Sequence, residues 1–189
     1  MKRKILNVMP ECYVDTNLIE YLLDGVVNHQ HCCSKVVGQL NNTFADKFAI
    51  GIIDKDKVEL GYIQDCDEIA KTEHLTLLKH KSRHQYLIRI SPAVDKFVLD
   101  SAKEQGVDTE KYNLPSTLKE FTKLSKSVTS NTDERFKNLF AAINGNSEFR
   151  ALKRTLEYLL DKQYKTDISE LTRIFGGEAR EENRVIGEV

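Results

Sequence analysis

The chain has 189 residues, of which 40% are hydrophobic and 30% charged, a composition typical of a folded globular protein. Its net charge of −1 gives no overall attraction to nucleic acid, and no apolar run approaches the roughly 20 residues needed to cross a bilayer. The basic start is followed by too short an apolar stretch for a signal peptide, and the four cysteines are not spaced as a disulfide framework. We therefore expect a reduced, cytoplasmic protein that does not enter a membrane.

The first part of the sequence alternates strand and helix patterns. We expect strands at 5–9, 26–33 and 48–53, with helices at 16–23 and 34–44 between them. The run 48–53 is almost continuously apolar, which is typical of a central strand that is covered on both faces, as in parallel sheets. The alternating order therefore predicts an α/β fold with a mostly parallel sheet flanked by helices.

The pattern changes beyond residue 114. A further strand at 85–90 is followed by Ser91-Pro92 and a helix at 93–103, and after that only amphipathic helices are predicted: 116–128, 133–143, 147–164 and 167–175. Ser, Asp or Gly residues stand at their ends, as helix caps require. We therefore divide the chain into an α/β domain at 1–109, an all-α extension at 110–177 and a charged tail at 178–189.

Acidic residues follow two of the predicted strands. Glu11 ends the first strand, and Asp54 and Asp56 follow the apolar strand as an Asp-x-Asp pattern. Because the carboxyl ends of parallel strands meet at one edge of a sheet, these three side chains should converge there. Three carboxylates repel one another unless a hard cation holds them, and Mg²⁺ or Mn²⁺ is the usual cation. The pattern predicts metal-dependent phosphoryl chemistry.

Residues 4–100 resemble a TOPRIM domain, the topoisomerase–primase fold that also occurs in OLD-family nucleases. Glu11 matches the glutamate of that family, and Asp54-Lys55-Asp56 matches its Asp-x-Asp pattern. The segment 85–98, which carries Asp95 on its helix, is similar to the later part of TOPRIM-like proteins from bacterial defence loci. Two positions depart from the pattern, since Cys12 stands where many members have glycine and Lys57 follows Asp56.

The resemblance implies a nuclease that cleaves nucleic-acid phosphodiesters with Mg²⁺ or Mn²⁺. Glu11, Asp54 and Asp56 would be catalytic, and Asp15, one helical turn beyond Glu11, would join them as a metal ligand. The resemblance to defence proteins further implies an antiviral effector under the control of a protein partner such as an ATPase. The helices in 110–175 are the expected docking surface, because they are more numerous than one sheet needs for cover.

Four basic residues are candidates for binding the phosphate. Lys55 lies within the Asp-x-Asp pattern, and Lys79, Lys81 and Arg83 lie in a polar turn before the strand at 85–90. Each could neutralise negative charge that develops on a phosphate, although a solvated surface charge is the simpler interpretation.

Other readings of the sequence remain open. The segment 13–19 resembles the opening of a PIN-domain ribonuclease, in which Asp15 rather than Glu11 would end the first strand. A third possibility is a TOPRIM-like fold that serves as a non-catalytic assembly or regulatory subunit. The segment 29–33, His-Gln-His-Cys-Cys, contains zinc-ligand residue types, but no matching second pair follows downstream.

Overall fold

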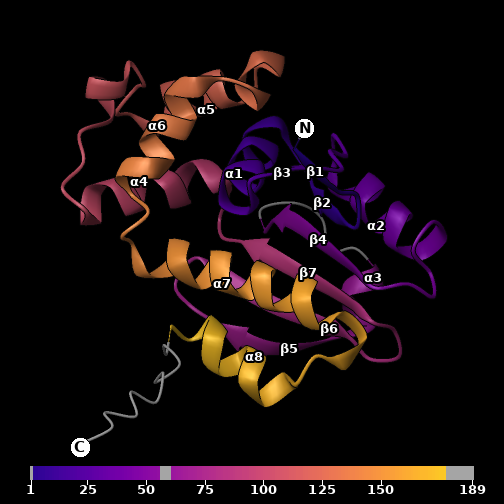
Figure 1. Cartoon of the computed structure of the whole chain (residues 1–189). Coiled ribbons are helices and arrows are strands. Elements are labelled where there is room, and N and C mark those ends of the chain that lie inside the picture. The colour runs from indigo at the N-terminus through magenta and orange to yellow at the C-terminus, as the bar shows by residue number, and fades with distance from the viewer. Residues whose placement is uncertain (1, 56–60, 178–189) are drawn as a thin grey trace, which may run out of the picture.

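The centre of the fold is a five-stranded sheet, seen in the computed structural model, which describes residues 2–55 and 61–177 (Figure 1). In spatial order its strands are β2 (Val8–Pro10), β4 (Ala49–Asp54), β7 (Gln85–Ile90), β6 (Leu75–His80) and β5 (Cys66–Lys71). β4 is parallel to both β2 and β7, whereas β6 is antiparallel to both β7 and β5.

The α/β class is confirmed, but the prediction of a mostly parallel sheet is wrong, because the sheet is mixed. β5, β6 and β7 follow one another through short turns, and a short turn can join only antiparallel neighbours. The parallel pairs β2–β4 and β4–β7 are each joined through longer connections that contain helices.

The predicted strand at 5–9 forms two shorter strands. β1 (Arg3–Ile5) pairs in parallel with β3 (Gly25–Val27) in a small separate sheet, and β2 begins three residues after β1 ends. The chain after β3 continues alongside β2, because Asn28 N donates to Val8 O at 2.9 Å and Gln30 N donates to Pro10 O at 3.1 Å. The segment 28–30 therefore reaches the same edge of the fold as the carboxyl end of β2.

Helices cover both faces of the sheet. On one face, α2 (Cys33–Asn42) packs Val36 and Leu40 against β2, β4 and β7, with the short α3 (Gly61–Gln64) beside it. On the other face, α1 (Tyr13–Leu23) and α4 (Val94–Glu104) bury apolar side chains against Ile50 and Ile88. This two-sided cover explains why β4 is buried along its whole length and is apolar up to Asp54.

Beyond α4 the described chain is helical, as predicted. Its elements are η1 (Thr109–Tyr112), α5 (Leu118–Ser125), η2 (Val128–Asn131), α6 (Glu134–Ala142), α7 (Ser147–Lys162), η3 (Gln163–Lys165) and α8 (Ile168–Phe175). Figure 1 shows α7 and α8 lying across the sheet, and Leu152 and Phe175 belong to the same hydrophobic core as Ile50 and Ile88. These late helices therefore share the core of the first half of the chain. No helix in the described ranges has the length and apolar character of a membrane span.

Gly51 provides a test of the packing between β4 and α2. A Cβ at Gly51 would lie 2.8 Å from a methyl group of Leu87 and 2.8 Å from one of Val36. We expect Gly51→Ala to lower the free energy of unfolding by about 1–3 kcal/mol through overpacking. Urea unfolding measures this. The control is Gly38→Ala within α2, where a Cβ meets nothing within 4 Å. Replacing this helical glycine with alanine should raise the free energy of unfolding by about 0.5–1 kcal/mol. A neutral Gly51→Ala would contradict this close packing.

Candidate functional site

Two of the predicted acidic residues meet where β2 and β4 end. Glu11 directly follows β2, Asp54 is the last residue of β4, and the two strands are parallel neighbours. Glu11 Oε2 accepts a hydrogen bond from Asp54 N at 3.2 Å. Glu11 is fully buried and Asp54 is 7% exposed. The structure therefore brings together two residues that are far apart in the sequence, at the edge where the parallel strands end.

α4 brings a further carboxylate to this edge. Asp54 Oδ1 accepts a hydrogen bond from Val94 N, the first residue of α4, at 3.0 Å. The next residue is Asp95, which is also buried, in the first turn of the helix where the helix dipole favours negative charge. Sequence reasoning noted Asp95 but left it out of the site. The signal in the sequence was its place in the first turn of a helix that follows a predicted strand; the structure adds that this strand, β7, is parallel to β4 and ends at the same edge.

Asp15 is the fourth buried carboxylate. It lies in the first turn of α1, where its Oδ2 accepts a hydrogen bond from Cys12 N at 3.1 Å. Within the described residues, Asp15 Oδ1 and Asp95 Oδ1 are both buried without a hydrogen-bond partner. Burial raises the pKa of Asp15 to about 7, and the negative charges of Glu11 and Asp95 add to this effect. Asp15 therefore keeps its proton at pH values well above those at which an aspartate usually ionises.

The neighbouring thiol of Cys12 is not an activated nucleophile. Burial raises the pKa of Cys12 far above its ordinary value, and the negative charges of Asp15 and Asp54 act in the same direction. A reactive cysteine needs a depressed pKa, which positive neighbours would supply. Cys12 therefore supplies no thiolate nucleophile to this edge.

The two unpartnered oxygens bear on whether this group of carboxylates fits a cation. Glu11, Asp15, Asp54 and Asp95 present only oxygen ligands, the type that Mg²⁺ and Mn²⁺ prefer. The unpartnered oxygens of Asp15 and Asp95 fit this chemistry, since a buried oxygen without a donor gains most from a cation. Across residues 2–55 and 61–177, however, no three His, Cys, Asp or Glu side chains are already arranged to hold a metal. Asp56 lies outside the described residues.

The predicted phosphate-binding residues are distributed over two edges of the sheet. Lys55 is exposed in the turn that follows Asp54 and is therefore at the carboxylate edge. Lys79, Lys81 and Arg83 lie at the other edge, where β6 ends and β7 begins. There Lys81 Nζ donates to Gln64 O at 2.9 Å. A six-residue strand, roughly 16 Å long, separates the two edges, so the structure does not bring this turn and the carboxylates together.

A buried histidine holds α4 in place beside the carboxylates. His74 precedes β6, and its ring lies between two acids, with Nδ1 2.6 Å from Glu148 Oε2 and Nε2 2.9 Å from Asp100 Oδ2. Its carbonyl oxygen accepts a hydrogen bond from Ser91 N at 2.7 Å, just before the start of α4. Glu148 belongs to α7 and Asp100 to α4, so His74 ties both helices to the sheet.

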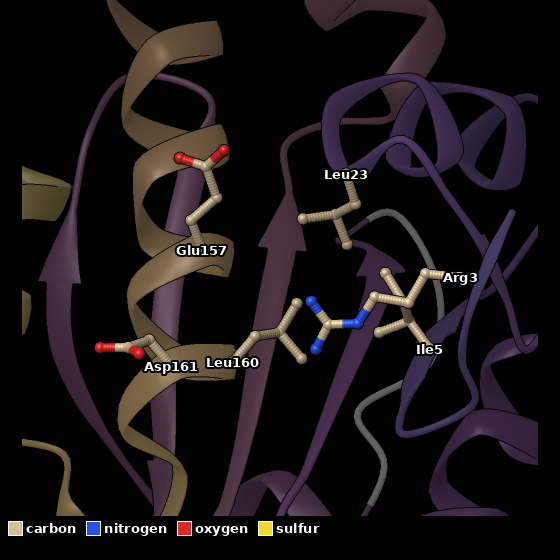
Figure 2. Close-up of a pocket in the computed structure, with 6 residues that line it drawn as sticks. All are labelled: Arg3, Ile5, Leu23, Glu157, Leu160 and Asp161. Carbon is tan, nitrogen blue, oxygen red and sulfur yellow. The ribbon is translucent and has the colours of Figure 1, made fainter.

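A pocket lies away from the carboxylates, between β1, the C-terminal end of α1 and α7. Its volume is about 380 Å³, and its lining residues are Arg3, Ile5, Leu23, Glu157, Leu160 and Asp161. Figure 2 shows the Arg3 side chain extending toward Leu160 of α7. Because the carboxylates lie at the N-terminal end of α1, the length of this helix separates them from the pocket. The pocket is therefore not part of the candidate site.

No protein-family model, curated protein or solved structure matches the chain.

The raised pKa of Asp15 predicts how stability depends on pH. Unfolded Asp15 ionises near pH 4, whereas in the folded protein Asp15 keeps its proton up to about pH 7. Between these values the folded state binds more protons, so the free energy of unfolding falls as the pH rises, by up to about 1.4 kcal/mol per unit. Asp15→Asn should remove this part of the decline.

Urea unfolding at several pH values measures the decline, with Asp46→Asn, at an exposed position, as the control that should follow the wild type. Equal declines in the wild type and in Asp15→Asn would contradict the raised pKa.

His74 predicts a dependence of the same sign, in a higher pH range. Burial favours the neutral ring, but the hydrogen bonds to Glu148 and Asp100 outweigh it, and the pKa of His74 is raised. The stabilisation is therefore complete below the unfolded pKa near 6.5 and is lost as the pH rises through the folded value. His74→Gln should cost more stability at about pH 5.5 than at about pH 9. His84→Gln, at an exposed position, is the control in the same unfolding measurements. If His74→Gln lost the same stability at both pH values, this would contradict the pairing of a protonated His74 with Glu148 and Asp100.

Proposed function

We propose that this protein is a divalent-metal-dependent nuclease of the TOPRIM type, which hydrolyses phosphodiester bonds in nucleic acid. The observation that carries the proposal is the contact between Glu11 and Asp54 at the ends of two parallel strands, with Asp15 and Asp95 buried near them. Clustering ionisable acids in a buried environment costs stability, which indicates that the arrangement has a function. An Asp-x-Asp pattern after the central strand and a glutamate after its neighbour are also what the TOPRIM resemblance implies.

The residues are assigned as follows. Asp15, Asp54 and Asp95 would hold Mg²⁺ or Mn²⁺ together with Asp56, which follows Asp54 by two positions. When bound, such a cation polarises a phosphoryl oxygen and lowers the pKa of a water ligand. Glu11 would be a further ligand or the general acid or base at the scissile phosphate. Asp15 would release its proton when a cation binds, because a positive charge favours the carboxylate form.

Lys55 is the basic residue that we retain for the phosphate, because it follows Asp54 directly and is exposed. Lys79, Lys81 and Arg83 face another edge of the sheet and would take part only if the substrate or a partner extended that far. Control by an ATPase or another protein, docking on the helical region, and a role in antiviral defence rest on the TOPRIM resemblance.

A non-catalytic subunit is the second candidate, and one observation favours it. Glu11, Asp15 and Asp54 each accept a hydrogen bond from a backbone N–H, which is how carboxylates that merely cap helices and strand ends are held. The PIN-type alternative requires Asp15 to end the first strand, whereas β2 ends at Pro10 and Asp15 lies inside α1.

Metal binding and cleavage can be tested together. We expect Mn²⁺ and Mg²⁺ to raise the melting temperature of the wild type and to support cleavage of labelled plasmid, tRNA or single strands. Glu11→Gln and Asp54→Asn keep an acceptor for the same N–H groups but remove charge. They should reduce cleavage by at least about 10²-fold and weaken the shift in melting temperature. Asp67→Asn, an exposed position on β5, is the matched control.

The outcomes separate the two candidates. Cleavage that Glu11→Gln and Asp54→Asn retain at the wild-type rate would overturn the proposed site. A wild type that neither binds Mn²⁺ nor cleaves any of these substrates would support the non-catalytic subunit instead.

A further inference from the structure

Two histidines lie beside the carboxylate edge in a chain of hydrogen bonds. Gln30 N donates to Pro10 O, so the segment that holds His29 and His31 runs next to the residue before Glu11. His29 Nδ1 lies 2.8 Å from Thr16 Oγ1, and His29 Nε2 lies 2.9 Å from His31 Nδ1. Tyr13, two residues after Glu11, stacks on His29 with ring centroids 4.6 Å apart and meets the His31 ring edge-on at 5.8 Å.

The hydroxyl of Thr16 fixes the direction of this chain. Thr16 Oγ1 donates its only hydrogen to Cys12 O at 2.8 Å, so it can only accept from His29. His29 must therefore carry its hydrogen on Nδ1. In a neutral ring the other nitrogen, Nε2, is then an acceptor, and it takes the hydrogen of His31 Nδ1. This order leaves the lone pair of His31 on Nε2.

Two further observations agree with this order. Burial and the neighbouring His31 lower the pKa of His29, which keeps its ring neutral and able to accept. His31 is exposed, and no described residue forms a hydrogen bond with its Nε2. Its backbone has a φ of 70°, in the left-handed region that non-glycine residues rarely occupy and that is found more often at functional sites.

We propose that His31 is the general base of the nuclease in place of Glu11, which then acts as a metal ligand. His29 and Thr16 are the positioning residues of His31, and the inference rests on the proposed function. His31 Nε2 removes a proton from the attacking water as the water oxygen bonds to phosphorus. The bond from phosphorus to the leaving ester oxygen breaks, and that oxygen takes a proton from solvent. The positive charge on His31 is shared through its Nδ1–H with His29, and His31 then releases its proton to solvent. A base that is oriented by a second group is the same logic that operates in catalytic triads.

The tautomers test the positioning without any substrate. Long-range ¹H–¹⁵N correlation spectra of the full chain, recorded where the rings are neutral, should show His29 and His31 both protonated on Nδ1. Thr16→Val removes the acceptor for His29 Nδ1 and should shift the His29 ring toward the Nε2–H form. A His31 ring protonated on Nε2 in the wild type would overturn the inference.

Kinetics test the base itself. His31→Asn should lower single-turnover cleavage with Mn²⁺ by roughly 10²- to 10⁴-fold, with unchanged Mn²⁺ affinity and partial rescue by added imidazole. Asparagine tolerates left-handed backbone, so the variant should fold, which circular dichroism checks. His84→Asn is the matched control, because His84 is an exposed histidine in contact with the Tyr164 ring, at the start of β7 and away from the carboxylate edge.

The outcomes distinguish the two proposals. If the wild type is active and His31→Asn cleaves at the same rate, the role of His31 is overturned while the proposed nuclease function stands. A wild type that cleaves none of the substrates would overturn both.

Discussion

The carboxylates that gather at one edge of the sheet are the constraint on which the candidate site depends. Negative charges in a buried environment repel one another and lose their hydration, so each needs a compensating group. The fold supplies backbone N–H groups for Glu11, Asp15 and Asp54, and a retained proton for Asp15. Compensation is incomplete, because one oxygen of Asp15 and one of Asp95 remain without a hydrogen-bond partner within the described chain.

The scaffold explains why these groups meet. β2, β4 and β7 are parallel and end together, so the residues that follow them arrive at one edge. α1 and α4 begin at that edge and place Asp15 and Asp95 in their first turns, where helix dipoles favour negative charge. His74 and its two acidic partners then hold α4 to the sheet and to α7, so the start of α4 is fixed from two sides.

Part of the candidate site could be read from the sequence. Glu11 and Asp54 were expected to converge because each stands at the end of an apolar run. Such a run identifies a strand from local sequence alone, and the ends of parallel strands meet at one edge of a sheet. Asp95 and the pair His29 and His31 were noted but not assigned to the site. Their positions depend on which strands become neighbours, which is a long-range property of the sheet.

The sequence by itself determined the local elements. The strand at 85–90 was predicted at the bounds of β7, and the helices at 147–164 and 167–175 lie within two residues of α7 and α8, because side-chain periodicity and capping residues act over a few positions. Only the tertiary structure decided that β5 and β6 run antiparallel and that the turn before β7 lies away from the acids. Strand direction and order follow from pairing between distant segments and from packing of both faces of the sheet, and no local pattern specifies either.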